Sequence, residues 1–340
     1  MKMSLFTRRV AIAAMSGAVA MTAMASVATA DTTRLRFHTF YGTEIDPIIK
    51  KFTDAVKDAS GGDLRVQVFH GGELVASDQL LEAAAKGSID IAHGTGGYWP
   101  GQVDIGNIEA GLPGGWTSVK EAKDFFDSAP VNALLSEAYQ EAGVVYLGKG
   151  YGHDYDLLTK EPVANLEEMK TRKIRATSAV AKVLSHFDIP TVYMPAGELY
   201  IGLSTGVIDG VIYGGPVEYE QLKLNEAAKY YTRLNMLMPG WTETFLANPD
   251  KWNALSDEHK KIMQDAIAQF AQDINDWLAA GNESVAAKGD VFVFSELPEA
   301  DSKQLTVAAQ DVWQEEAARS ARNAKLIELL VENAKAQGRL

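Results

Sequence analysis

Cysteine is absent from this 340-residue sequence, and its absence excludes disulfides, thiolate metal sites, thiol redox motifs and cysteine nucleophiles together. Positive charge is also scarce, because 32 Lys and Arg stand against 45 Asp and Glu and give a formal net charge of −13. Nucleic-acid binders present basic patches to the phosphate backbone, so a nucleic-acid partner is not expected. The length and the hydrophobic fraction of 46% instead indicate about two globular domains with a substantial core.

Catalytic signatures are missing as well. The sequence has no Gly-x-Ser-x-Gly elbow, no His-Glu-x-x-His metal motif and no Gly-x-x-x-x-Gly-Lys-Ser/Thr phosphate loop. The six histidines are never spaced four residues apart, and no pair of carboxylates is singled out by the pattern. Nothing in the sequence therefore requires an enzyme, although an exported enzyme stays open as an alternative.

The first thirty residues have the pattern of an export signal. Lys2, Arg8 and Arg9 form a positive region, an apolar stretch follows over residues 10–27, and residues 28–30 read Ala-Thr-Ala, the small-x-small pattern of a signal peptidase site. The paired arginines also resemble a twin-arginine signal, so the export route stays open between the two systems. No later stretch approaches the roughly 18 apolar residues that a membrane span needs. The mature protein is therefore expected to be exported and not to span the membrane.

The rest of the chain contains an internal repeat. Residues 79–90 can be aligned with residues 198–209, because both indicate an amphipathic helix that ends at a glycine, Gly87 or Gly206, before a short strand that begins Ile-Asp. The same order holds upstream, where two short strands have counterparts, residues 35–38 and 66–69 matching 173–176 and 191–194. Each copy predicts strand–helix–strand–helix–strand, which favours an α/β fold of two lobes, each a mostly parallel sheet with flanking helices. Ligands of such sheets bind beyond the carboxyl ends of the strands, so a cleft between the lobes is expected.

A long helix is predicted near residues 256–288. Ser256 is a good N-cap, and the apolar stripe that follows continues for so many turns that the helix would be on the order of 45 Å long, enough to cross both lobes. The sequence then predicts this division: signal peptide 1–30, lobe I 31–151, lobe II 152–237, a return to lobe I over 238–255, the lobe-spanning helix 256–288, and a crossing strand with C-terminal helices over 289–340. The helical pattern of the last part is expected to break near Ser320.

Several motifs in the second repeat carry a family resemblance. Residues 173–176 (Lys-Ile-Arg-Ala), 193–195 (Tyr-Met-Pro) and the spaced pattern over 198–210 resemble a DctP-type solute-binding protein of the tripartite ATP-independent periplasmic (TRAP) transporters. The resemblance covers essentially the whole mature chain. It implies a two-lobed periplasmic-binding-protein-like fold, a periplasmic location, a small organic acid as ligand, and TRAP membrane permease subunits as partners, driven by ion gradients without ATP. It also implies that Arg175 forms a salt bridge with the ligand carboxylate, a task that suits the planar fork of an arginine.

Three glycine-rich segments resemble the branch of that family that binds α-keto acids, lactate and related monocarboxylates, namely residues 97–101, 214–216 and 239–243. Some members of the branch hold the acid together with a metal ion bound by a glutamine and two glutamates. The corresponding positions here fall near Tyr155 and at Ile212, and only Glu243 keeps its carboxylate. Losing two oxygen ligands weakens such a site severely, so neither a bound metal ion nor a cofactor is expected.

The predicted site has Arg175 as its anion anchor. Its aromatic walls are expected to be Tyr98, Trp99, Tyr155, Tyr213 and Trp241, and its other polar groups Thr95, His153 and Glu243. Plain core packing is the alternative for each aromatic residue, above all for Trp99 and Trp241. A carboxylate at Glu243 beside a bound acid would favour a ligand that also carries a hydroxyl or ammonium group.

The sequence thus predicts a receptor that closes two lobes over a keto or hydroxy acid. An aromatic acid or a sulfonate also fits an arginine in an aromatic pocket, and a sensory adaptor or an exported enzyme could use the same scaffold. The oligomeric state is not indicated by the sequence.

Overall fold

The strands of the protein form two separate sheets. The computed structural model describes residues 32–237, 240–338 and 340, so the predicted signal peptide lies outside the described residues. The first sheet, in the order β2-β1-β3-β10-β4, consists of β1 (Thr33–Thr39), β2 (Leu64–Phe69), β3 (Ile91–Gly94), β4 (Val145–Tyr151) and β10 (Thr242–Ala247). The second, in the order β11-β9-β5-β8-β6-β7, consists of β5 (Leu157–Thr159), β6 (Ile174–Arg175), β7 (Thr191–Val192), β8 (Gly210–Ile212), β9 (Tyr230–Arg233) and β11 (Val293–Glu296).

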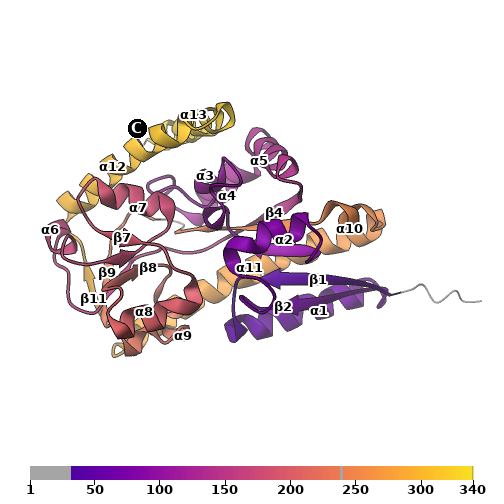
Figure 1. Ribbon diagram of the computed structural model, residues 1–340, viewed down its shortest axis with the longest axis horizontal. Helices are drawn as coiled ribbons and strands as arrows, with labels where there is room; N and C mark the ends of the chain where they lie inside the picture. The colour runs from indigo at the N-terminus through magenta and orange to yellow at the C-terminus, as the bar shows by residue number, and fades with distance from the viewer. Residues whose placement is uncertain (1–31, 238–239, 339) are drawn as a thin grey trace, which may run out of the picture. The chain divides into compact units, whose positions relative to one another are not determined.

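Helices connect and cover these strands (Figure 1). Before β5 lie α1 (Asp46–Ala59), α2 (Leu80–Ala85), α3 (Gly106–Glu109), α4 (Val119–Asp127) and α5 (Ala129–Glu141). Between β5 and β10 lie α6 (Leu166–Met169), α7 (Ser178–Ser185), α8 (Leu199–Thr205) and α9 (Pro216–Gln221). The remaining helices are α10 (Pro249–Asn253), α11 (Asp257–Lys288), α12 (Glu299–Ala317) and α13 (Ala321–Ala336).

The internal repeat is visible in the topology of the two sheets. In the first sheet β1 pairs in parallel with β2 and β3, and in the second β6 pairs in parallel with β7 and β8. An antiparallel strand then follows in each sheet, β10 beside β3 and β5 beside β8. At the end of the repeated helices, Gly87 and Gly206 have φ of +72° and +78°, a left-handed conformation that favours glycine. The predicted α/β fold of two lobes is confirmed, although the sheets are mixed: the first has two parallel and two antiparallel pairings. Lobe I here means the first sheet with its helices, and lobe II the second.

The chain passes between the sheets along residues 152–156 after β4, again between β9 and β10, and a further time through α11, which lies between β10 and β11. The first two of these passages are the crossing segments. These crossing segments are hydrogen-bonded to one another: the N–H of Gly152 donates to the carbonyl of Trp241 at 3.0 Å, and that of Tyr155 to the carbonyl of Leu237 at 3.3 Å. The N–H of Gly240 donates to the carbonyl of His153 at 2.6 Å. Paired extended segments of this kind are suited to act as a hinge, because a few backbone dihedrals there can rotate one lobe against the other.

The long helix α11 runs from Asp257 to Lys288, which confirms the helix predicted near 256–288. The Ser256 hydroxyl caps it by accepting the N–H of His259 at 3.1 Å, and Gly289 ends it with a left-handed φ of +74°. Its side chains contact both lobes: Asp273 pairs with Lys51 of α1 at 2.7 Å, and Asn282 accepts the N–H of Val217 in α9 at 3.0 Å. On lobe I the helix also completes an aromatic core with Phe37, Phe52 and Phe270.

The last two helices form a strap, defined here as α12 and α13, across the two lobes. α12 packs against α7 of lobe II, whereas α13 contacts α3 and α5 of lobe I (Figure 1). Ser320 caps α13 by accepting the N–H of Asn323 at 3.0 Å, so the predicted break near Ser320 is confirmed.

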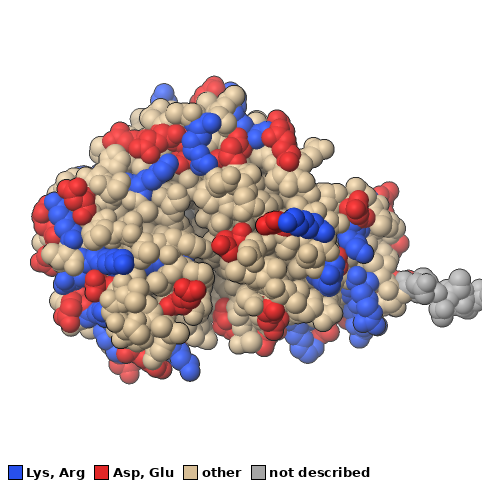
Figure 2. Space-filling view, in the orientation of Figure 1, with Lys and Arg blue, Asp and Glu red and all other residues tan. Residues whose placement is uncertain are grey.

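The surface carries both signs of charge. On the face that Figure 2 shows, Lys and Arg are interspersed with Asp and Glu, and no large basic patch forms there. Within the described part of the chain, no helix combines the length and apolar character that a membrane crossing needs.

Candidate ligand-binding site

Arg175 ends β6, at the carboxyl edge of the second sheet, and is 1% exposed. Its Nε donates to the carbonyl of Met194 at 3.0 Å and its Nη1 to the carbonyl of Ile212 at 3.1 Å, so the strands on either side hold the guanidinium in place. The rings of Tyr193 and Tyr213 lie 5.3 and 5.1 Å from the guanidinium carbon. Its Nη2 has no hydrogen-bond partner among the described residues, and no carboxylate there forms an ion pair with Arg175. The site therefore presents a buried, fixed positive charge with a free donor.

That guanidinium lines a cavity between the two lobes. The cavity has a volume of about 30 Å³ and is lined from lobe I, from lobe II and from the crossing segments by Thr95, Gly97, Tyr98, Asn107, Ala110, Gly111, Tyr155, Arg175, Thr177, Ala179, Tyr213, Gly240 and Trp241. The structure thus brings together six residues that the sequence indicated, Thr95, Tyr98, Tyr155, Arg175, Tyr213 and Trp241. A cavity lined from both sides of a hinge changes shape when the lobes move.

Three polar atoms around the cavity lack partners. The Nη2 of Arg175, the Oγ1 of Thr95 and the Nε1 of Trp241 are buried without a hydrogen bond to any described residue. Burying a polar group unpaired costs free energy, so proteins rarely collect such groups without a purpose. All three can donate, and the site is therefore suited to a ligand that offers several oxygen acceptors.

Aromatic rings form the walls of the cavity. Tyr155 stacks on Tyr213 with ring centroids 6.1 Å apart and lies 5.9 Å from the ring of Trp241. Gly240 is required beside this stack, since a Cβ there would lie 2.3 Å from Cγ of Tyr155. Burial raises the pKa of the Tyr98 hydroxyl, which therefore stays protonated and able to donate.

Two of the predicted polar groups lie away from the cavity. The Glu243 carboxylate turns into lobe I, where the Tyr41 hydroxyl donates to Oε1 at 3.1 Å and the Nε2 of His93 lies 3.1 Å from Oε2. His153 lines a different cavity, beside Asp154 and Asp156. The placement of both in the ligand pocket is therefore corrected, and the suggestion of a ligand hydroxyl or ammonium opposite Glu243 loses its basis.

Trp99 is a packing residue. Its Nε1 donates to the hydroxyl of Tyr139 at 3.2 Å, and its ring covers Gly94, where a Cβ would lie 2.6 Å from the nearest ring atom.

The sequence analysis missed Asn107 and Thr177, which do line the cavity. Thr177 could have been found from its position two residues after Arg175, whereas Asn107 carries no signal in the sequence.

The residues around the cavity do not fit a metal ion. Ile212 offers no side-chain oxygen, its carbonyl is taken by Arg175, and the Glu243 carboxylate is turned toward Tyr41 and His93. Among the described residues, no group of three His, Cys, Asp or Glu side chains could hold a metal ion. Hard cations need several oxygen ligands, so these side chains do not support metal-assisted binding of an acid.

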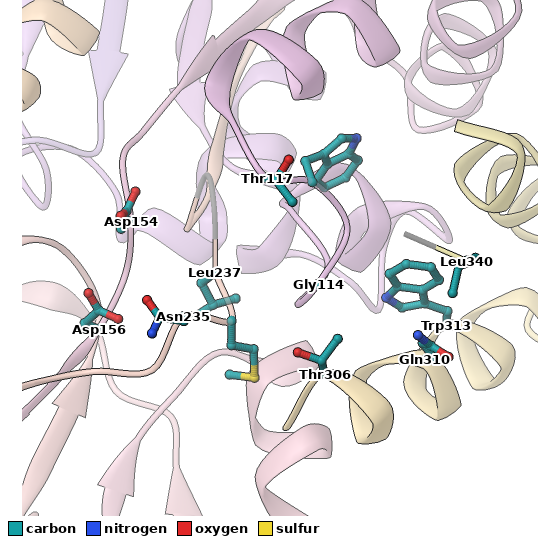
Figure 3. Close-up of a pocket in the computed structure, with 12 residues that line it drawn as sticks. Gly114, Thr117, Asp154, Asp156, Asn235, Leu237, Thr306, Gln310, Trp313 and Leu340 are labelled. Atoms are coloured by element: carbon teal, nitrogen blue, oxygen red, sulfur yellow. The ribbon is translucent and has the colours of Figure 1, made fainter. Parts of the chain in front are cut away.

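A larger cavity of about 370 Å³ lies along the crossing segments (Figure 3). Asp154, Asp156 and Asn235 lie on one side of it, and Gln310 and Trp313 of α12 on the other (Figure 3). No lysine, arginine or histidine of the described residues lines it. Burial raises the pKa of Asp156 to about 6, although the N–H of Leu234 opposes the shift, so this carboxyl is mostly ionised at neutral pH. The negative charge makes this cavity unsuited to an acid ligand, despite its size.

Glu218 of α9 gives lobe II a testable pH dependence. It is 4% exposed, its Oε2 accepts the N–H of Gly215 at 2.9 Å, and burial raises its pKa to about 8, with Glu243 and Glu44 adding to the shift. A raised pKa means that the folded state keeps a proton that the unfolded chain loses, so this stability is fully present below about pH 4.5 and is lost as the pH rises through 8. We expect Glu218→Gln to be more stable than the wild type by a few kcal/mol at about pH 9, and the difference to vanish toward pH 5.

Urea unfolding at a series of pH values measures this difference. Glu226→Gln, which changes an exposed glutamate nearby, serves as the control and should follow the wild-type curve. Parallel pH profiles for the wild type and Glu218→Gln would contradict the prediction.

Comparisons with known proteins give a consistent picture. A family model described as bacterial extracellular solute-binding protein, family 7 (DctP) matches residues 43–320. The chain is 26% identical over 215 residues to the monocarboxylate 2-oxoacid-binding periplasmic protein all3028 of Nostoc sp., an alignment that covers 63% of this chain and 59% of that protein's length. It is 28% identical over 254 residues to the ectoine-binding periplasmic protein TeaA of Halomonas elongata, with 72% of each chain covered.

A solved structure extends the similarity to the fold. A TRAP periplasmic solute binding protein from Chromohalobacter salexigens, with bound (S)-(+)-2-amino-1-propanol, superposes with a TM-score of 0.84 at 22% sequence identity. The superposition covers 90% of this chain and 97% of that one. At this identity the likeness shows that the two chains share the two-lobed fold.

Proposed function

Because the chain belongs to the DctP family, family 7 of the bacterial extracellular solute-binding proteins, we propose that it is the periplasmic receptor of a TRAP-type transporter for a small monocarboxylate. Proteins of this family bind solutes for transport, so the chain is a binding protein and not an enzyme. The proposed ligand class is 2-oxo or 2-hydroxy monocarboxylic acids. The observation that carries the proposal is the buried guanidinium of Arg175, which lines the cavity between the lobes without a carboxylate partner among the described residues.

Arg175 supplies the anchor for the acid group. Two of its nitrogens are already held by backbone carbonyls, which leaves Nη2 to donate to a ligand carboxylate. A charge-assisted hydrogen bond in a buried site is stronger than a neutral one, and a donor that is already fixed loses little entropy on binding. The Tyr213 ring over the guanidinium holds its plane in place.

The other free donors favour a second oxygen on the ligand. Thr95 and Trp241 line the same cavity with unpartnered Oγ1 and Nε1 atoms, and a 2-oxo or 2-hydroxy group next to the carboxylate offers them an acceptor. The Nostoc relative is named for 2-oxoacids of monocarboxylate type.

Capture by lobe closure follows from where the lining residues lie. Arg175 belongs to lobe II and Thr95 to lobe I, so a ligand held by both binds the closed arrangement better than the open one. Such a ligand shifts the equilibrium between the two by its differential affinity. The closed receptor would then deliver the acid to the permease subunits of an ion-driven transporter.

Thermal unfolding against matched acids tests the proposal. At a hundredfold excess over Kd, a ligand of the folded state adds about 2.7 kcal/mol, which raises Tm by several degrees in a chain of this size. We expect pyruvate, lactate and 2-oxobutanoate to stabilise the protein and propanoate, which lacks the second oxygen, to do so far less. Thr95→Val should reduce the difference between pyruvate and propanoate while leaving the response to propanoate unchanged. A panel in which benzoate, methanesulfonate or ectoine stabilises the protein and no 2-oxo or 2-hydroxy acid does would overturn the ligand class.

A further inference from the structure

The strap carries a buried carboxylate at its bend. Glu316 of α12 is 0% exposed, and its Oε1 accepts hydrogen bonds from the Nδ2 of Asn107 at 2.9 Å and the Nζ of Lys182 at 2.7 Å. Its Oε2 accepts from the Nη1 of Arg319 at 2.7 Å. One side chain therefore joins three segments that lie far apart in the sequence.

The partners of Glu316 belong to different lobes. Lys182 lies on α7, which follows the short strand β6 of the second sheet and packs against α12. Asn107 lies on α3, two residues before Glu109, whose carboxylate is paired with Lys149 of β4 at 2.6 Å in lobe I. α12 lies along α7 (Figure 1), and near its end Trp313 and Arg319 donate to the carbonyls of Pro113 and Pro100 in lobe I at 2.9 and 2.6 Å. Glu316 therefore lies where the strap meets both lobes, bonded to Lys182 of lobe II and to Asn107 of lobe I.

The electrostatics keep this carboxylate charged. Burial alone would raise the pKa of Glu316, but the hydrogen bonds from Lys182, Arg319 and Asn107 outweigh it and lower the pKa below its usual value. The bond from Asn107 is thus charge-assisted, and charge-assisted bonds are about twice as strong as neutral ones. Asn107 also lines the ligand cavity, so the bond fixes one residue of the cavity wall.

We propose that Glu316 is a positioning residue that latches the two lobes in the closed arrangement by holding Lys182 of lobe II and Asn107 of lobe I at the same time. When lobe II rotates away about the crossing segments, Lys182 and Asn107 move apart, and Glu316 cannot keep its bonds to both. The latch rests on the proposed function, since closure is the step that retains the ligand. Glu316 acts on the ligand through Asn107 and through the lobe equilibrium, without lining the cavity itself.

The absence of native cysteine allows a test that needs no ligand. Leu74 of lobe I and Val207 of lobe II are 46% and 52% exposed, so Leu74→Cys and Val207→Cys give two labelling sites for spin labels and a distance distribution by pulsed electron paramagnetic resonance. We expect Glu316→Ala and, independently, Asn107→Ala to lower the ratio of closed to open protein about tenfold, and the double variant to lower it no further. Asn107→Ala leaves the ion pairs of Glu316 intact, so it tests the latch even if Glu316→Ala folds poorly.

The control is an ion pair on the same strap that stays within one lobe. Arg322 of α13 pairs with Glu141 of α5 at 2.7 Å, so Glu141→Ala should leave the distance distribution as in the wild type. Identical distributions for the wild type, Glu316→Ala and Asn107→Ala overturn the latch.

Binding kinetics with pyruvate as the probe separate the latch from the ligand proposal. For Glu316→Ala we expect the dissociation rate of pyruvate to rise about tenfold with an unchanged association rate, because the ligand enters the open form and the latch acts after closure. A merely structural defect would lower Tm and leave the dissociation rate unchanged, and that result overturns the latch. If pyruvate binds neither the wild type nor the variants, the proposed ligand fails while the distance measurement still decides the latch.

Discussion

Replacing Arg175 by methionine is expected to abolish stabilisation by the acid ligand while leaving the ligand-free protein folded, because the loss of the buried charge offsets the loss of the hydrogen bonds to Met194 and Ile212. The guanidinium is buried without an ion-pair partner among the described residues, and an uncompensated buried charge costs folding free energy. Methionine keeps most of the side-chain volume and removes that charge. Truncating one partner of a buried charge pair costs binding about 2–5 kcal/mol, so the affinity should fall at least about thirtyfold. Thermal unfolding with and without pyruvate measures both effects.

Arg175→Lys is the matched variant for this prediction. It keeps the positive charge and loses the planar fork that bonds the carbonyls of Met194 and Ile212. We expect an intermediate loss of affinity, about tenfold, together with a Tm in the absence of ligand below that of Arg175→Met, because the lysine keeps the buried charge and still cannot satisfy both carbonyls. A folded Arg175→Met protein that responds to the acid as the wild type does would remove the carboxylate anchor and the ligand class with it.

The fold could be predicted from the sequence because its signals are local and occur twice. The glycines at positions 87 and 206, each after an amphipathic helix, mark the same step of the two repeats, and the structure gives both strand sets the same parallel order. Ser256, a good N-cap, marked the start of the long helix, which ends at Gly289 in a left-handed conformation. Such signals depend on a few neighbouring residues, and therefore survive without knowledge of the tertiary contacts.

Which side chains face the cavity could be predicted only in part from the sequence, and β10 shows the physical reason. Side chains alternate between the two faces of a strand, and every residue of Thr242–Ala247 is buried, so no polar and apolar alternation marks which face meets the ligand. Thr242 and Thr244 turn toward Glu109, whereas Glu243 between them turns toward Tyr41 and His93. A shift of one position thus separates the residues that bond Glu109 from the one that contacts Tyr41 and His93, and none of the three lines the cavity.

Contacts between distant segments could not be predicted at all. Asn107 and Glu316 are 209 positions apart, and their bond depends on how the strap lies over both lobes. Neither residue belongs to a motif, and a buried glutamate looks like any other glutamate in the sequence. The candidate latch is therefore visible only in three dimensions.

The largest loss of stability is expected from Glu109→Gln. Glu109 is 0% exposed and Lys149 1%, with Oε1 and Nζ 2.6 Å apart, and the hydroxyls of Tyr139 and Thr244 complete the bonding of the carboxylate. Burial lowers the pKa of Lys149 and the charge of Glu109 opposes that shift, so the ammonium depends on its partner. Breaking such a pair on one side leaves a buried charge unpaired, which costs about 3–5 kcal/mol. Urea unfolding at neutral pH measures the loss.

A second substitution decides whether the loss of stability comes from the unpaired ammonium of Lys149 or from the lost hydrogen bonds of the Glu109 carboxylate. If the loss comes from the stranded ammonium, Lys149→Met in the Glu109→Gln background should restore much of the stability, because a buried ion pair can be replaced by apolar groups at little cost. The exposed pair of Lys50 and Asp54 is the control, and Asp54→Asn should change the free energy of unfolding by less than about 0.5 kcal/mol. A double variant as unstable as Glu109→Gln would instead assign the loss to the bonds that Tyr139 and Thr244 make with the carboxylate. Ala110 and Gly111 directly follow Glu109 and line the ligand cavity. The affinity of the double variant for the acid therefore measures whether the hydrogen bonds around Glu109 also position this wall of the cavity.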